Sequence, residues 1–173
     1  MSHIIFAAAD NPLESRPNPH EKMLSVNEAI ALGVKNIPSS LLESDFDRDK
    51  PNVVLVCDRN INIDLETDCI DDGDYDDDFA VWAPDLPHDL PTEKPFAAVL
   101  QWGRCTEGRA LQFIEYLREQ LKTSQEIELF SVWLSDEIVI EESAKLSINE
   151  LTVSHIQKLE QHPIINTRYK ITR

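Results

Sequence analysis

The pattern of apolar and polar positions along the chain first of all indicates β-strands. Apolar runs at 3–9, 53–57 and 127–134 predict strands, and the run at 53–57 is expected to be covered on both faces because no position in it is polar. Over 60–66 apolar and polar residues alternate strictly, and 164–172 alternates again from Ile165 onward, which predicts two strands with one solvent-facing side.

Three segments carry the signals of helices. Ser25 and Glu28 have the spacing of a capping box, and Gly33 marks the expected end of the first helix. Thr106 is the expected N-cap of a second helix over 106–123, and a third is expected over 152–161. The inward-facing residues are predicted to be Val26, Ala29, Ile30 and Leu32 on the first helix and Ala110, Leu111, Ile114, Leu117 and Leu121 on the second.

The segment 96–134 has the order strand, capped helix, strand, with short connections. This order predicts a right-handed β-α-β crossover between parallel strands. Further strands are expected at 79–83 and at the edge position 137–142. The turn-forming residues 71–74 precede the strand at 79–83, so residues 60–83 are expected to form a hairpin with an acidic tip.

These elements predict one globular domain over 1–173 with an α/β fold, consisting of a single mixed β-sheet and about three helices. An α+β arrangement is the alternative. With 42% hydrophobic and 28% charged residues, the composition is typical of a folded domain, and the chain contains no internal repeat or linker-like stretch.

Charge changes this picture, because the formal net charge of −16 is concentrated in one part of the chain. Residues 43–93 contain 17 acidic and 3 basic residues, whereas the remainder contains 15 and 13. Within 58–78 there are ten acidic residues and one base, Arg59. A solvated acidic loop is the simplest interpretation of such a run.

The competing interpretation is a docking surface for a cationic partner, since an acidic patch accelerates association with a basic protein. Nearby aromatic side chains would supply the apolar contact area that charge alone lacks. The residues predicted to bind the partner are Asp71, Asp72, Asp74, Tyr75, Asp76, Asp77, Asp78 and Trp82.

Calcium binding is an alternative use of the acidic run. With Asp68 as the first position of an EF-hand loop, Ile70 and Phe79 occupy the third and twelfth positions, where oxygen ligands are required. The sequence therefore does not match an EF-hand, and no cofactor is predicted. A less regular calcium site stays open as an alternative, with ligands drawn from Asp71, Asp74, Asp76 or Asp78.

Cys105 is the one candidate nucleophile, because it immediately precedes the helix cap at Thr106, where a helix dipole lowers the pKa of a thiol. However, no histidine is near it in sequence, and Arg109 follows too closely for a phosphatase-type loop. A small buried cysteine is the favoured interpretation.

Several classes of function are disfavoured. Nucleic acid would be repelled by the negative charge, and no apolar run is long enough to cross a membrane. The three cysteines, Cys57, Cys69 and Cys105, are read as free thiols in a reducing cytoplasm. A cytoplasmic location is therefore expected.

The leading hypothesis is a non-enzymatic acidic binding protein that docks a basic protein. Small acidic α/β proteins of this kind are similar to bacterial immunity proteins, which inhibit toxins; the similarity lies in size, charge and lack of catalytic motifs, and it assigns no residue a role. The alternative is an enzyme or small-ligand protein with a site at the ends of the parallel strands, near 102–106. A subunit of a larger assembly is the third class.

Overall fold

The computed structural model describes residues 3–57, 62–64, 69–71, 75–83, 90–134, 138–161 and 165–173. The chain forms two compact units: Met1–Asn18 with Asp74–Arg173, here called the sheet unit, and Pro19–Gly73, here called the inserted unit. Each is described by itself. Whether they fold as the one cooperative domain expected over 1–173 stays a prediction.

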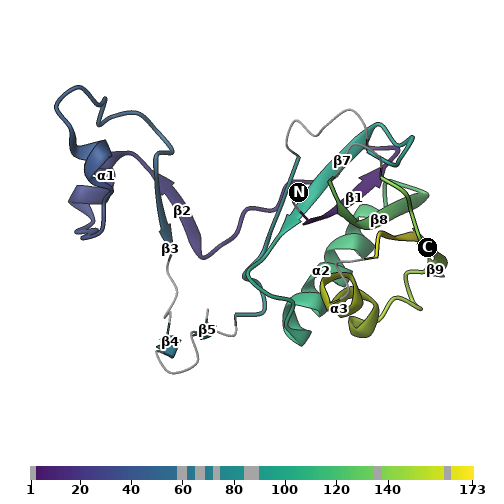
Figure 1. The fold of residues 1–173 in the computed structure, drawn as a ribbon. Helices are drawn as coiled ribbons and strands as arrows, with labels where there is room; N and C mark the ends of the chain where they lie inside the picture. The colour runs from purple at the N-terminus through teal and green to yellow at the C-terminus, as the bar shows by residue number, and fades with distance from the viewer. Residues whose placement is uncertain are drawn as a thin grey trace. The chain divides into compact units, whose positions relative to one another are not determined.

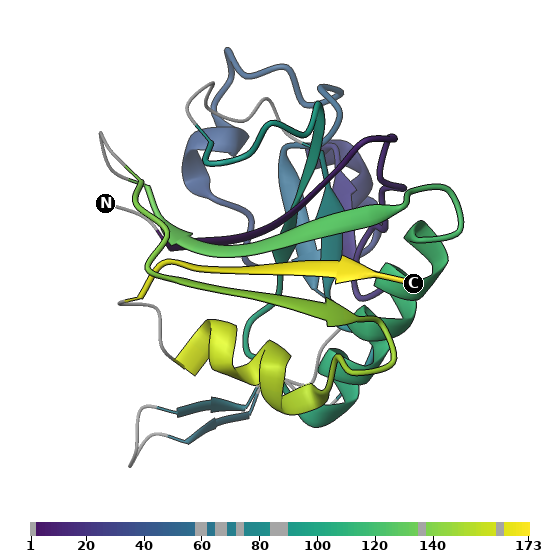
Figure 2. The ribbon, with the colours of Figure 1, turned by 90° about the vertical axis from the view of Figure 1, so that its right-hand side faces the viewer.

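The described part of the sheet unit contains a six-stranded mixed sheet in the order β6-β7-β1-β8-β10-β9 (Figure 1). All neighbouring strands are antiparallel except β9 and β10, which are parallel, and Figure 2 shows β10 between β8 and β9. The strands are β1 (His3–Ala9), β6 (Ala80–Trp82), β7 (Phe96–Gln101), β8 (Glu126–Trp133), β9 (Glu142–Ser147) and β10 (Thr167–Thr172).

The predicted β-α-β crossover over 96–134 is present. β7 and β8 are both antiparallel to β1 and are therefore parallel to each other, with β1 between them. Helix α2 (Glu107–Gln120) connects them. Together with the mixed sheet, this crossover makes the fold α/β, as expected.

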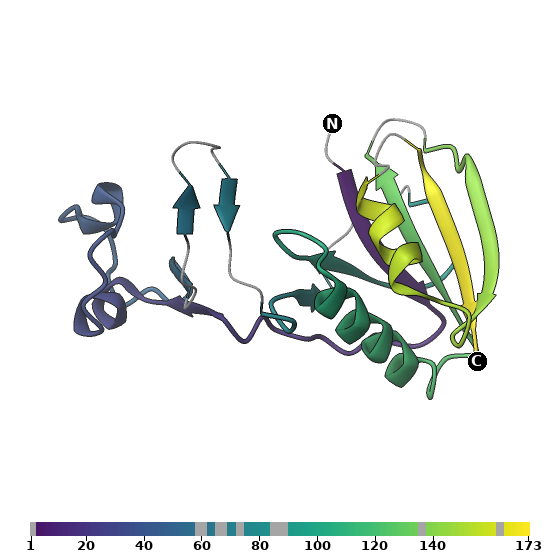
Figure 3. The same cartoon turned by 90° about the horizontal axis from the view of Figure 1, so that it is seen from below.

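Helices α2 and α3 (Val153–Gln161) lie on one face of this sheet (Figure 3). Their apolar residues join those of β1, β8 and β10 in the main core, which includes Phe113 and Ile156. The opposite face has a smaller apolar cluster around Phe6 and Phe130, whose rings stack at 4.6 Å, and no described helix of the sheet unit contributes to it.

The N-cap of α2 is Thr106, as predicted, and its hydroxyl accepts a hydrogen bond from the Arg109 amide at 3.2 Å. Four of the five residues of the predicted apolar stripe are buried: Ala110, Ile114, Leu117 and Leu121. Leu111 is the exception at 51% exposed, and Phe113 and Tyr116 face the core in its place. The aromatic residues displace Leu111 because their larger apolar area makes the face through 113, 116 and 117 the better one to bury.

The hairpin expected over 60–83 is wrong in its pairing. Strand β4 (Asn62–Asp64) pairs with β5 (Cys69–Asp71), and β6 pairs instead with β7 in the main sheet. The physical reason is burial: Phe79 and Val81 enter the core of the sheet unit, which a two-stranded acidic hairpin could not provide.

The inserted unit begins with β2 (Glu21–Leu24), a strand that the sequence analysis missed, paired with β3 (Val54–Cys57). The prediction that β3 is covered on both faces is wrong, because Val54 is 4% exposed on one face whereas Leu55 on the other face is 53% exposed. Helix α1 (Val26–Ala31) has the predicted capping box between Ser25 and Glu28. A 3-10 turn, η1 (Ser39–Leu42), follows it. Ile30 and Leu32, expected to face inward, are exposed.

The C-terminal strands agree with the sequence only in part. Along β10, Thr167, Tyr169 and Ile171 are buried in alternation, as the pattern predicted. The edge strand is Glu142–Ser147, one strand length later than expected, because the edge forms where the chain runs parallel to β10 rather than where apolar residues are richest.

Candidate functional site

The described part of the predicted docking surface, Tyr75 to Trp82, is held in place by a buried ion pair. Nη2 of Arg109 on α2 lies 3.0 Å from Oδ2 of Asp78, and both side chains are almost fully buried. The other oxygen of Asp78 accepts from Nδ2 of Asn18 at 2.6 Å. Asp78 was predicted to contact the partner. Its carboxylate is 1% exposed and instead anchors the segment.

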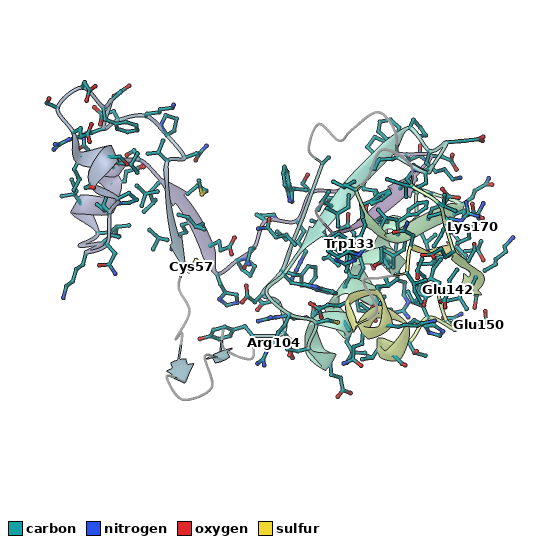
Figure 4. All side chains as sticks on the ribbon, viewed as in Figure 1. Cys57, Arg104, Trp133, Glu142, Glu150 and Lys170 are labelled. Atoms are coloured by element: carbon teal, nitrogen blue, oxygen red, sulfur yellow. The ribbon has the colours of Figure 1, made fainter. Side chains whose placement is uncertain are left out.

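Arg109 also fastens the chain on both sides of this pair. Its Nε donates to the carbonyl oxygen of Tyr75 at 3.1 Å, and its Nη1 donates to that of Arg104 at 3.0 Å. Arg104, labelled in Figure 4, lies in the turn between β7 and α2. One buried guanidinium therefore joins the predicted docking segment to the start of α2.

A second arginine supports the same segment from the other side. Backbone hydrogen bonds of 2.7 and 2.8 Å connect Arg16 with Val81, so Arg16 covers the outer edge of β6. The Arg16 guanidinium lies 3.5 Å from the centre of the buried Phe79 ring and donates to the Phe79 carbonyl oxygen at 3.1 Å. The segment is thus fixed by Asp78, Phe79 and Val81.

Exposed residues flank these anchors. Tyr75 is 40% exposed and Trp82 47% exposed, Asp76 is exposed, and Asp77 is half-buried. The Asp76 carboxylate packs against the α-carbon of Gly108 in the first turn of α2, where the helix dipole favours a negative charge. Of the other predicted residues, Asp71 lies on β5 without a described side chain, and Asp72 and Asp74 lie outside the described residues.

Cys105 is not an activated thiol. Burial raises its pKa to about 12, and the Glu160 carboxylate adds to that effect, while Arg109 opposes it. The helix dipole expected to lower the pKa is outweighed because the thiol is half-buried and next to an acid. Its position supports the structural interpretation of this cysteine.

The alternative site, at the ends of the parallel strands, contains a cavity of about 380 Å³. It is lined by side chains from β1, β6, β7 and α3, all in the sheet unit: His3, Ile4, Ile5, Trp82, Val99, Leu100, Gln101, Trp102 and Glu160. Trp102 makes edge-on contacts with Phe79 and Phe113, at 6.3 and 5.8 Å between ring centres. The wall of the cavity that Trp102 forms is therefore rigidly supported.

His3 and Ser131 meet at this end of the sheet, but they do not form a nucleophilic pair. The Ser131 hydroxyl donates to the carbonyl oxygen of Leu159 at 2.7 Å and is 1% exposed. Its oxygen therefore accepts the 2.8 Å bond from Nε2 of His3, which places the imidazole proton on Nε2. Burial also lowers the pKa of His3, so the ring is neutral at pH 7.

A larger cleft, of about 740 Å³, lies on the face of the sheet opposite the helices. Its charges are mutually paired: buried Glu128 accepts from Thr92 at 2.6 Å and lies 3.1 Å from Lys170 (labelled in Figure 4), while Lys94 binds Asp10 at 2.8 Å. The basic residues of β10 thus complement acidic residues of β8, and the charges at the centre of this cleft are already paired with one another.

The described residues contain no group of three His, Cys, Asp or Glu side chains arranged to hold a metal ion. Of the four residues of the calcium alternative, Asp78 is already bound by Arg109 and Asn18, and Asp76 is exposed. Asp71 has no described side chain, and Asp74 lies outside the described residues. No helix among the described residues is long and apolar enough to cross a lipid bilayer.

Comparisons with family models, with curated proteins and with solved structures find no match to this chain. The candidate site is therefore defined by its own geometry. Sequence reasoning missed the roles of Arg109, Arg16 and Glu160. One signal could have identified Arg109. It lies three residues after the N-cap Thr106, where the helix dipole disfavours a cation, so an acidic partner for it could have been expected.

Proposed function

We propose that this protein is a non-enzymatic binding protein that docks a cationic protein partner through the acidic surface at 71–82. The observation that carries the proposal is the exposure of Tyr75 and Trp82 at either end of a segment anchored by buried Asp78 and Phe79. Exposed aromatic rings on a fixed backbone are the anchors that protein interfaces favour, because little conformational entropy is lost on binding.

The charge of this surface selects the partner. Asp76 and Asp77 add to the acidic residues at 71, 72 and 74, and the surrounding stretch of sequence, 43–93, has 17 acidic and 3 basic residues. Such a surface attracts a basic protein and repels nucleic acid. More specifically, we propose that the protein acts as bacterial immunity proteins do, by binding a basic toxin and blocking its activity. Cys57 and Cys105, which are free thiols, fit a cytoplasmic location.

Charge reversal tests the proposal directly. Asp72, Asp74 and Asp76 are changed together to Lys, with Asp78 left in place so that its pair with Arg109 is retained. Immobilised wild-type and variant proteins are then used to capture proteins from a lysate of the source cells below and above physiological ionic strength. The wild type is expected to retain a basic protein that high salt releases, and the variant is expected to lose it.

A matched control distinguishes the effect of this site on binding from the effect of net charge. The triple variant Glu14→Lys, Glu115→Lys, Glu119→Lys changes the charge equally on exposed positions away from the segment. This control variant should bind the basic partner with the wild-type affinity and the wild-type dependence on salt. Equal behaviour of the two triple variants would show that binding is not located at 71–82.

A small-ligand protein is the second candidate function, because a cavity does exist beside Trp102. That cavity is lined by one acidic side chain, Glu160, and by the indole rings of Trp82 and Trp102.

A further inference from the structure

We propose that the cavity beside Trp102 receives an arginine or lysine side chain of the docked protein partner. The inference rests on the proposed function and adds the chemical identity of the anchoring residue. Trp82 joins the two features, because it is exposed on the docking segment and also lines the cavity. A partner lying along the acidic segment therefore reaches the cavity mouth.

Glu160 supplies the charge that a cation would neutralise. This carboxylate is half-buried, and its Oε2 accepts from the amide of Cys105 at 2.6 Å. No basic side chain in the described part of the chain forms an ion pair with Glu160. The charge of Arg109 lowers the pKa of Glu160, but its guanidinium is paired with Asp78. Burial raises the pKa of Glu160, which a bound cation would reverse.

The position of Glu160 in its helix reinforces this point. It lies in the last turn of α3, where the carbonyl end of the helix dipole disfavours a negative charge. The Cys105 amide offsets that effect for one carboxylate oxygen only. A ligand N–H donor at the other oxygen would complete the hydrogen bonding of a carboxylate that burial has partly separated from water.

The walls of the cavity suit the rest of such a side chain. Indole rings are the strongest aromatic partners of cations, and Trp82 and Trp102 both line the cavity. Trp102 is fixed by Phe79 and Phe113, so its ring is oriented before binding. The methylene stem of an arginine or lysine would cover apolar surface while its head reaches Glu160.

The polar lining also excludes anions. His3 is neutral because burial lowers its pKa, and its proton is on Nε2, so Nδ1 carries a lone pair that accepts rather than donates. Gln101 contributes an uncharged amide, and none of the lining residues is a lysine or arginine. With one acid and no cation around it, the cavity selects a positively charged group.

The probe is N-acetyl-arginine methylamide, compared with its citrulline counterpart, which has the same shape and no charge. Both are titrated into the full chain while the indole N–H signals of Trp82 and Trp102 are followed by NMR. Only the arginine probe is expected to shift both signals saturably. Glu160→Gln should weaken binding about tenfold or more, because a charged hydrogen bond becomes a neutral one. Glu119→Gln, an equal change of net charge on an exposed position, should leave affinity unchanged.

Equal shifts with the citrulline probe, or equal effects of Glu160→Gln and Glu119→Gln, would overturn the inference. Gln at 160 keeps an acceptor for the Cys105 amide, so folding should persist. If it does not, Trp82→Leu on the exposed wall provides the second variant, with the same expected loss. The triple Asp72, Asp74, Asp76 variant separates the two proposals: if it loses the partner while the arginine probe never binds, docking stands and the cavity inference fails. If the probe binds but that variant keeps its partner, the proposed docking surface fails.

Discussion

Nη2 of Arg109 and Oδ2 of Asp78 lie 3.0 Å apart in the interior of the sheet unit, where neither side chain has more than 1% of its surface exposed. The pair is completed by Asn18 and by the carbonyl oxygens of Tyr75 and Arg104. All the charge and most of the hydrogen-bonding capacity of the guanidinium is thus satisfied by protein atoms. Removing one member leaves the other buried and unpaired.

Arg109→Met is therefore expected to lower the free energy of unfolding by about 3–5 kcal/mol, measured by urea denaturation. Arg118→Met, on the exposed side of the same helix, removes a cation paired with Glu115 and should lower it by less than about 1 kcal/mol. Adding Asp78→Leu to Arg109→Met should recover part of the loss. Similar values for the two single variants would contradict the assigned role of the buried pair.

Gly108 is expected to show a context-dependent response to substitution. A β-carbon there would collide with the Asp76 carboxylate, so Gly108→Ala alone should be close to neutral, the clash offsetting the better helix propensity. In an Asp76→Ala background the same substitution should stabilise the protein by about 0.5–1 kcal/mol. Thermal denaturation of the four proteins measures the coupling, and additive effects would place Asp76 away from α2.

Cys105 should resist alkylation in the folded protein. Because burial raises its pKa from 9.0 to about 12, the reactive thiolate is suppressed by about a thousandfold relative to an ordinary thiol. Iodoacetamide labelling followed by peptide mass spectrometry should show slow modification of Cys105 until denaturant is added. Cys57, half-buried in the inserted unit, is the internal comparison. Rapid labelling of Cys105 in the folded protein would contradict this expectation and support a nucleophilic role for the thiol.

Stability should fall in alkaline solution. Burial raises the pKa of Tyr116 above its ordinary 10.0 as well as that of Cys105, so the folded state holds both protons more tightly than the unfolded state. The stability from these groups is fully present below about pH 9 and is lost as the pH rises through their folded values. Tyr116→Phe should lower stability at neutral pH by about 1 kcal/mol, through loss of its bond to the Glu14 carbonyl, yet flatten the alkaline decline. An unchanged alkaline slope would remove Tyr116 as a cause.

The capping box of α1 tests whether the chain is one cooperative domain. Ser25→Ala removes the hydroxyl that accepts from the Glu28 amide at 3.2 Å and should cost about 1 kcal/mol. If the two units fold together, calorimetry will show a single transition whose midpoint falls. Two transitions, with only one shifted by the substitution, would show that the inserted unit unfolds by itself.

Local signals in the sequence identified the elements that local physics determines. The caps at Ser25 and Thr106 were found because their hydrogen bonds span three residues, and the alternation of β10 was found because burial repeats every second residue. The crossover of β7, α2 and β8 followed from short connections, although the sequence did not show that β1 would lie between the two strands.

Long-range pairing was beyond the sequence. Whether the strand near Phe79 joins a hairpin or the main sheet depends on competition for burial, which no local pattern contains. The same holds for Asp78, which resembles its neighbours Asp76 and Asp77 in sequence and differs from them only because Arg109 reaches it from α2. Glu160 escaped notice for the same reason, since Cys105 is far from it along the chain.

The central position of β1 constrains how the chain can be made. Ile5 pairs with Leu100 on one side and with Ser131 on the other, and the His3 ring is bonded to a hydroxyl 128 residues later. During synthesis the apolar residues of β1 leave the ribosome long before either neighbouring strand exists. The sheet can close only after β8 has emerged, so the nascent chain must keep its first strand from aggregating until then, which predicts slow folding and a period of dependence on chaperones.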